Sequence, residues 1–261
     1  MTRRELLGGA VASLALPSYP LAAARKGEAP HVVALIAENE YETARTLPAF
    51  LKEEIEPRGL RCTVVGAETS NEDDFPGLNA LARADLLLVS VRRRTPRKEQ
   101  MAIVQQYVAE RKPIVAIRTA SHAFARANPP AGHESWPSFD REVLGGEYGG
   151  YDPIGRKVGS DVWADPDAKT HPALRGLENA RFRSQSWIYR MRFVAPSVRV
   201  LLRGRWPENG PVESVAWANE QDGMRAFYTS LGHPADFQLA QFRLLLLNAV
   251  YWALGQPTSR K

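Results

Sequence analysis

Short, continuous apolar runs that recur along the first half of the chain constrain its fold more than any other feature. The first run, residues 31–37, reads His-Val-Val-Ala-Leu-Ile-Ala, and the others span residues 60–65, 85–91 and 113–117. Runs of this length without alternating polar residues are typical of strands buried on both faces, as in a parallel sheet. The sequence therefore predicts four parallel strands at these positions.

The segments between these runs have the features of helices. Thr46, followed by Pro48, predicts the start of a helix that extends to Glu56. Thr95-Pro96 repeats the start signal before a longer segment with apolar residues at helical spacing. Strands that alternate with helices predict an α/β fold: a flavodoxin-like, doubly wound, mostly parallel sheet in three layers.

The second half of the chain is expected to be less regular. Residues 125–159 are rich in proline, glycine and aromatic residues, which predicts a long excursion outside the sheet with one short helix at 139–144. A final helix is expected from Asp236 to Leu254, with Asp236 as its N-cap. Later runs rich in apolar and aromatic residues predict strands at residues 198–202, 214–218 and 225–231.

The first 25 residues have the three parts of an export signal. Arg3 and Arg4 give a positive start, residues 8–16 form a short apolar stretch, and residues 21–24 offer small side chains for cleavage. Paired arginines predict the twin-arginine route, and hence a periplasmic or otherwise exported protein. A buried N-terminal helix is the alternative, because the apolar stretch is too short for a stable membrane span. Residues 26–257 are expected to form a single domain.

Composition and motifs argue against several classes of protein and site. The formal net charge is +5, and no nucleic-acid-binding motif accompanies it, so no nucleic acid is expected as a partner. Cys62 is the only cysteine, so no internal disulfide can form. The chain contains no His-Glu-x-x-His and no paired cysteines, and no metal site is therefore predicted. The sequence does not identify a cofactor.

Three turns at the carboxyl ends of the predicted strands carry the candidate site. In open parallel sheets, ligands bind beyond the carboxyl ends of the strands, where the strand order reverses. If the strand order is 2-1-3-4, the turns after the first, third and fourth strands converge on one crevice. These turns are residues 38–41 (Glu-Asn-Glu-Tyr), 92–94 (Arg-Arg-Arg) and 118–122 (Arg-Thr-Ala-Ser-His).

Each of these residues also has a structural alternative. Glu38 and Glu40 could pair with arginines and hold the loops, and Arg118 could be such a partner. Ser121 and His122 are adjacent, so their side chains are not expected to meet as a nucleophile–base pair without a bridging group. No Gly-x-Ser-x-Gly elbow surrounds Ser121 either.

Two further histidines are candidates because imidazole titrates near neutral pH. His233 lies in Leu-Gly-His-Pro at the end of a predicted strand, and His171 lies in Thr-His-Pro. A loop histidine without a catalytic role is the alternative for both. Four aromatic side chains could stack on sugar rings: Trp163, Trp187, Tyr189 and Trp206. Core positions are the more common place for such residues.

Several separated motifs resemble those of ThuA-like (trehalose utilisation) proteins. They are residues 37–43 with 46–48, residues 115–124, residues 136–146, residues 171–177 and residues 227–234. The resemblance covers about residues 31–255 and implies a fold similar to that of class I glutamine amidotransferases.

The resemblance also bears on activity. Class I glutamine amidotransferases place a nucleophilic cysteine after the strand that corresponds to residues 113–117. Here Arg118 occupies that position, and arginine stays protonated, which argues against glutaminase chemistry. Relatives often carry histidines in the glycine-rich segment, whereas residues 147–151 of this chain read Glu-Tyr-Gly-Gly-Tyr.

The ThuA-like resemblance implies a role in carbohydrate catabolism, on a disaccharide or its oxidised (keto) form. In that role Glu40 is expected to act as general base and His233 or His171 as acid. Arg118 is expected to stabilise developing negative charge on a sugar oxygen. Substrate contacts are expected from Glu38, Asn39, Tyr41, Arg92, Ser121, His122 and Tyr148.

Two other functions are left open by the sequence. One is a non-catalytic module that binds a sugar or a protein partner on the same fold. The other is an acyl transferase that uses Ser121 as nucleophile. The residues alone do not decide between an enzyme and a binding protein. A homodimer is compatible with either function.

Overall fold

The apolar runs found in the sequence form the strands of a central sheet. The computed structural model describes residues 28–206 and 209–257. The strands are β1 (His31–Ala37), β2 (Arg61–Gly66), β3 (Leu86–Val91), β4 (Ile114–Ile117), β5 (Gly146–Tyr151), β6 (Ser160–Ala164), β7 (Arg181–Ser184), β8 (Tyr189–Val194), β9 (Val198–Arg205), β10 (Glu213–Gln221) and β11 (Met224–Thr229).

Within the described residues, four α-helices and several shorter helical segments connect these strands. The α-helices are α1 (Thr43–Phe50), α2 (Lys98–Ala109), α3 (Gly155–Val158) and α4 (Ala240–Ala253). Wider π-helical turns span Leu51–Ile55 and Asp140–Leu144. Short 3₁₀ turns span Glu56–Arg58, Leu78–Arg83, Arg118–His122, Pro166–Ala168, Pro172–Leu174 and Pro234–Gln238.

The main sheet has a parallel half and an antiparallel half. Its nine strands run in the order β2-β1-β3-β4-β11-β10-β9-β6-β7. Strands β2, β1, β3, β4 and β11 pair in parallel, whereas β10, β9, β6 and β7 extend the sheet with antiparallel pairs. The predicted flavodoxin-like α/β fold is confirmed, and so is the strand order on which the predicted crevice depends.

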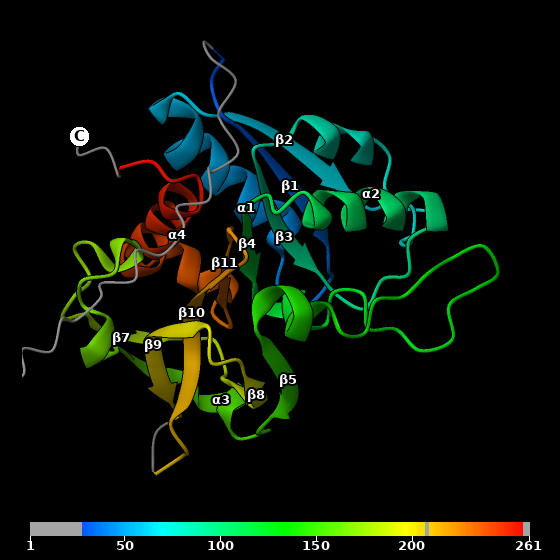
Figure 1. Cartoon of the computed structure of the whole chain (residues 1–261). Helices are drawn as coiled ribbons and strands as arrows, with labels where there is room; N and C mark the ends of the chain where they lie inside the picture. The colour runs from blue at the N-terminus through cyan, green and yellow to red at the C-terminus, as the bar shows by residue number, and fades with distance from the viewer. Residues whose placement is uncertain (1–27, 207–208, 258–261) are drawn as a thin grey trace, which may run out of the picture.

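Side chains of β1 alternate between two hydrophobic cores, one on each face of the sheet. Val32 and Ala34 belong to the core that includes apolar side chains of α1 and α4. Val33 and Leu35 belong to the core that includes those of α2. Figure 1 shows α2 and α4 on opposite sides of the parallel strands. Burial on both faces explains why this strand has no polar alternation in its sequence.

The glycine-rich segment differs from its prediction as a loop outside any sheet. Residues 146–151 form β5, which pairs with β8 in a separate two-stranded antiparallel sheet. A Cβ atom on Gly146 would lie 2.6 Å from the Trp217 ring, so the glycine is needed for close packing. Strands β6, β7 and β8 are also additions to the predicted set, because their partly exposed sequences lack a continuous apolar run.

Two predicted helix starts were wrong. Helix α1 begins at Thr43, and Pro48 lies inside it, because the Glu38 carboxylate binds the Thr43 amide and fixes the first turn earlier. Asp236 does not cap α4, which begins at Ala240. The segment before α4 is instead a 3₁₀ turn capped by His233.

The predicted export signal, residues 1–25, lies outside the described residues. Within the part of the chain that the structure describes, no helix combines the length and apolar character required to cross a membrane.

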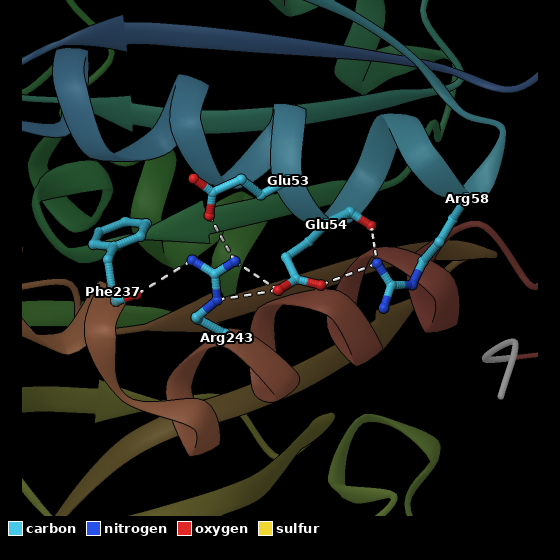
Figure 2. Close-up of polar contacts among 5 residues, drawn as sticks. All are labelled: Glu53, Glu54, Arg58, Phe237 and Arg243. Atoms are coloured by element: carbon cyan, nitrogen blue, oxygen red, sulfur yellow. Dashed lines mark hydrogen bonds and ion pairs between the residues drawn. The ribbon is translucent and has the colours of Figure 1, made fainter. Parts of the chain in front are cut away.

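A network of charged side chains joins α4 to the helical segment that follows α1 (Figure 2). Arg243 of α4 donates to the carboxylates of Glu53 at 2.9 Å and Glu54 at 2.6 Å. Arg58 donates to the same Glu54 carboxylate at 2.9 Å. The Arg243 guanidinium also reaches the carbonyl of Phe237 at 3.4 Å. Glu54 is therefore the shared acceptor of the network.

We expect Glu54→Gln to reduce the free energy of unfolding by about 1–2 kcal/mol, because two arginines lose a charged acceptor that is largely screened from solvent. The Glu54 side chain is 23% exposed, whereas that of Glu53 is 58% exposed. Glu53→Gln is thus the matched control, with an expected loss below about 0.5 kcal/mol. Urea unfolding measures both, and equal losses would contradict the central place of Glu54.

Candidate functional site

The turns after β1, β3 and β4 meet at the carboxyl edge of the sheet. The Arg92 amide donates to the carbonyl of Ala37 at 3.0 Å, and the Arg93 amide donates to that of His122 at 3.0 Å. The Arg92 guanidinium pairs with the Glu40 carboxylate at 2.8 Å. Side chains from three separated segments thus lie together, as the strand order requires.

Glu38 organises the turn after β1 from within. The residue is 4% exposed, and its carboxylate accepts the amides of Glu40 at 2.8 Å, Tyr41 at 2.7 Å and Thr43 at 2.8 Å. These contacts occupy both carboxylate oxygens. Asn39 lies on the exposed side of the turn and donates to Glu72 at 2.6 Å. Of these two residues, only Asn39 is open to solvent.

Arg118 occupies the sharp turn that directly follows β4. Its φ of 51° is left-handed, a conformation that costs a non-glycine residue about 1–2 kcal/mol. The guanidinium is fully buried and lies 4.0 Å from the ring of Tyr41, 4.3 Å from that of Trp187 and 5.1 Å from that of Tyr189. Nη1 donates to the carbonyl of Ser230 at 2.6 Å. The charge therefore sits beneath the surface of the site, enclosed by aromatic rings.

Ser121 and His122 make a contact that their adjacency argued against. Ser121 Oγ lies 3.1 Å from His122 Nδ1. The prediction that they would not meet was wrong, because residues 118–122 form a 3₁₀ turn, where neighbouring side chains are arranged differently from those of an α-helix. Ser121 is only 2% exposed, and its Oγ also contacts the carbonyl of Arg118 at 3.3 Å.

His122 is neutral in this environment. Burial, together with the charges of Arg93, Arg92 and Arg118, lowers the pKa of its imidazole to about 3. The ring packs on Tyr148 of β5, with 4.5 Å between ring centroids. Near neutral pH this imidazole can donate and accept hydrogen bonds, but its low pKa makes it a weak proton acceptor.

A cavity of about 380 Å³ opens beside Ser121 and His122. Its far wall comes from the helical turn 140–144 and from β5 and β8, and its charged residues were not predicted from the sequence. They are Asp140, Arg141, Glu147 and Arg192. Burial raises the pKa of the Asp140 carboxyl to about 6. No sequence signal pointed to these residues, because β5 and β8 pair over a long chain separation.

His233 lies near Arg118, on the 3₁₀ turn that precedes α4. Its Nδ1 accepts the amide of Ala235 at 3.2 Å, so the neutral ring carries its proton on Nε2. Burial lowers the pKa of His233, while the charge of Asp236 opposes that change. Asp236 is itself fully buried, and it accepts the His233 amide at 3.1 Å.

The structure does not bring His171 to this edge of the sheet. It packs on Trp252 of α4 with ring centroids 5.1 Å apart, in a cavity that it shares with Arg225. Arg225 lies at the amino end of β11. The carboxyl end of β11 leads to Ser230, which contacts Arg118. His171 thus lies at the opposite end of the strand.

The aromatic candidates divide between structural and accessible positions. Trp187 and Tyr189 enclose Arg118 and are almost completely buried. Tyr41 joins them, with its ring centroid 5.3 Å from that of Trp187. Tyr148 is half-buried and lines the cavity. Among residues 28–206 and 209–257, no group of three or more His, Cys, Asp or Glu side chains could hold a metal ion.

Comparisons with known proteins agree with this architecture. The family model described as "Trehalose utilisation" (ThuA) matches residues 31–253. A putative ThuA-like protein from Parabacteroides merdae ATCC 43184 is 17% identical, with a TM-score of 0.66 over 90% of this chain and 93% of that one. A putative ThuA-like protein from Bacteroides uniformis ATCC 8492 is 20% identical, with a TM-score of 0.62 over 90% and 95%. At these identities the likeness concerns the fold.

A part of a longer enzyme has a similar fold. Agd3, described as a novel carbohydrate deacetylase, is 13% identical with a TM-score of 0.56, over 87% of this chain but 32% of the enzyme. No curated protein sequence matches this chain.

The neutral state of His122 predicts an acid-dependent loss of stability. The unfolded imidazole takes up a proton near the ordinary pKa of 6.5, whereas the folded one does so at about 3. Between these values the unfolded chain binds more protons, so the free energy of unfolding falls as the pH decreases. The slope from this residue is at most about 1.4 kcal/mol per pH unit. His122→Gln should flatten the profile measured by urea unfolding across this range.

Ser121→Ala is the control for that profile, because it keeps the imidazole and should keep the slope. Asp140 contributes with the opposite sign, since its pKa is raised by burial, but it is present in every variant. A His122→Gln profile as steep as that of the parent protein would show that His122 titrates normally.

Proposed function

This chain belongs to the ThuA (trehalose utilisation) family, and on that premise we propose that it serves carbohydrate catabolism. The proposed ligand is a disaccharide, or the keto form of one, held in the cavity beside His122. The proposed activity is a hydrolase- or lyase-type reaction on that sugar, without glutaminase activity.

The composition of the cavity wall carries the proposal. A sugar ring has an apolar face of C–H groups and a rim of hydroxyls. Tyr148 offers an aromatic surface next to the neutral His122 ring. Arg141, Glu147 and Arg192 offer charged donors and acceptors around it. An apolar platform with a few convergent polar groups is the usual form of a small-molecule site.

Arg118 supports the proposed lack of glutaminase activity. It stands where the related fold places a nucleophile, in a left-handed turn after β4. Its guanidinium stays charged and is fully buried. It therefore offers neither a nucleophilic atom nor direct contact with a ligand, and it would stabilise negative charge only through its electric field.

The proposed chemistry is proton transfer to and from the sugar. Glu40 of the turn after β1, which pairs with Arg92, is the proposed base, because the low pKa of His122 makes its imidazole a weak proton acceptor near neutral pH. His233 is the proposed acid and would act from its protonated form, because the Nε2–H of a neutral ring donates a hydrogen bond but does not release its proton near neutral pH. The position of His171 does not support a part in this chemistry.

We expect the purified protein to bind trehalose or a 3-keto-disaccharide, and Tyr148→Leu to weaken that binding about tenfold through loss of the aromatic surface. Tyr151→Leu is the matched control, because Tyr151 lies on the same strand, stacks on Trp187 and does not line the cavity. Titration calorimetry measures both variants. A panel of disaccharides and keto-disaccharides that leaves the heat of mixing unchanged would end the proposal.

A non-catalytic sugar-binding module is the second candidate, favoured by the burial of Arg118 at the nucleophile position. Glu40→Gln separates the two functions. In an enzyme it should lower turnover by about 10²–10⁴-fold with little change in affinity. In a binding module it should leave the affinity unchanged while no product forms from any variant. Glu72→Gln, which loses an ion pair with Arg94, controls for the general effect of removing a carboxylate.

Export by the twin-arginine route belongs to the same proposal. Its support is the pair Arg3 and Arg4 ahead of a short apolar stretch and small residues. An exported protein would meet its sugar substrate outside the cytoplasm.

A further inference from the structure

A second, larger cavity lies at the end of the sheet away from the candidate site. Its volume is about 740 Å³, within the range of about 300–1,000 Å³ that is usual for small-molecule sites. Residues of the segment 169–178, the start of β9, the end of β10, the start of β11 and the end of α4 with the residues that follow it form its wall. These elements can be followed around α4 and β9 in Figure 1.

His171 lines the cavity and carries a buried hydrogen-bond donor that has no partner among the described residues. Its Nδ1 accepts the amide of Ala173 at 3.2 Å, so Nδ1 carries no proton. Burial, together with the charges of Arg199 and Arg225, lowers the pKa of His171 to about 4, and the ring is neutral near neutral pH. Its proton is therefore on Nε2. Nε2 is buried and has no partner among the described residues, and His171 as a whole is 7% exposed.

Basic side chains outnumber acidic ones around the cavity. Lys169, Arg175, Arg199 and Arg225 line it, with Glu178 and Glu220 as the acidic residues. Glu220 faces Arg225 at 3.6 Å, and Glu178 accepts the Gly176 amide.

Two of the basic residues contact only neutral oxygens within the described chain. Lys169 Nζ donates to the side-chain oxygen of Asn179 at 3.0 Å. Arg199 Nη2 donates to the carbonyl of Asp167 at 2.7 Å. Neither residue makes an ion pair among residues 28–206 and 209–257, so both leave positive charge at the cavity.

We propose that this cavity binds a small oxyanion-bearing molecule, of the size of a phosphorylated or carboxylated sugar. The anionic group would be held by Lys169 and Arg199, with Arg225 and the ring of His171 on the same wall. Charge-assisted hydrogen bonds to phosphate or carboxylate are the strongest use of such donors.

This second site is independent of the proposed sugar site. The cavity begins near Arg225 at the amino end of β11, whereas the sugar site lies beyond the carboxyl end of that strand. No residue lines both cavities. Loss of ligand binding at one of them therefore says nothing about the other.

Titration calorimetry of the full chain tests the proposal with four probes: inorganic phosphate, glucose 6-phosphate, glucuronate and glucose. We expect glucose 6-phosphate or glucuronate to bind with a Kd of about 1 mM or tighter, and glucose to bind at least about tenfold more weakly. The anion that binds more tightly identifies the phosphate or the carboxylate as the natural group. Affinity should fall as salt increases, because the contacts are ionic.

Variants locate the binding. Lys169→Gln combined with Arg199→Gln should weaken the anion at least about tenfold, and Arg199→Gln alone is the measurement to use if the double variant unfolds. Arg205→Gln is the matched control, since Arg205 lies on the same strand β9 and does not line the cavity. Equal affinity for glucose and glucose 6-phosphate, the absence of any anion binding, or equal loss in Arg205→Gln would each overturn the proposal.

Discussion

A fully buried positive charge holds the candidate site together. The Arg118 guanidinium lies where the ends of β4 and β11 meet, and it contacts the ring of Tyr41, the ring of Trp187 and the carbonyl of Ser230. A charge so placed is stable only if surrounding groups replace its hydration. Aromatic faces contribute about 2 kcal/mol each when water is excluded. The turn after β1, the segment before β8 and the end of β11 are therefore bound to one side chain.

The same charge defines the electrostatics of its neighbours. Asp236, fully buried in the segment before α4, attracts Arg118 and also accepts hydroxyl donors from Ser184 and Ser186. The charge of Arg118 also lowers the pKa of His122. Together with burial and the charges of Arg92 and Arg93, it keeps that ring neutral. A site with a neutral imidazole under positive potential suits a ligand rich in hydroxyls or one that develops negative charge.

Sequence reasoning reached the scaffold of the site but not all of its wall. The parallel strands followed from the places of the apolar runs, and the assumed order 2-1-3-4, which the structure has, brings Glu40, Arg92 and Arg118 to one edge. The contact between Ser121 and His122 could not follow, because it depends on the kind of turn that joins them. The charged wall of the cavity was missed as well, since β5 and β8 pair across about forty residues of chain with weak strand signals.

The sequence alone determined which segments form the buried parallel strands and that an arginine occupies the turn after β4. These features are local, because a continuous apolar run has few ways to leave water. Only the tertiary structure decided the neutral state of His122, the burial of Arg118 and the place of His171 beside a second cavity. The pKa of a side chain and its burial depend on residues that are distant in sequence but close in the fold. A local sequence pattern does not contain that information.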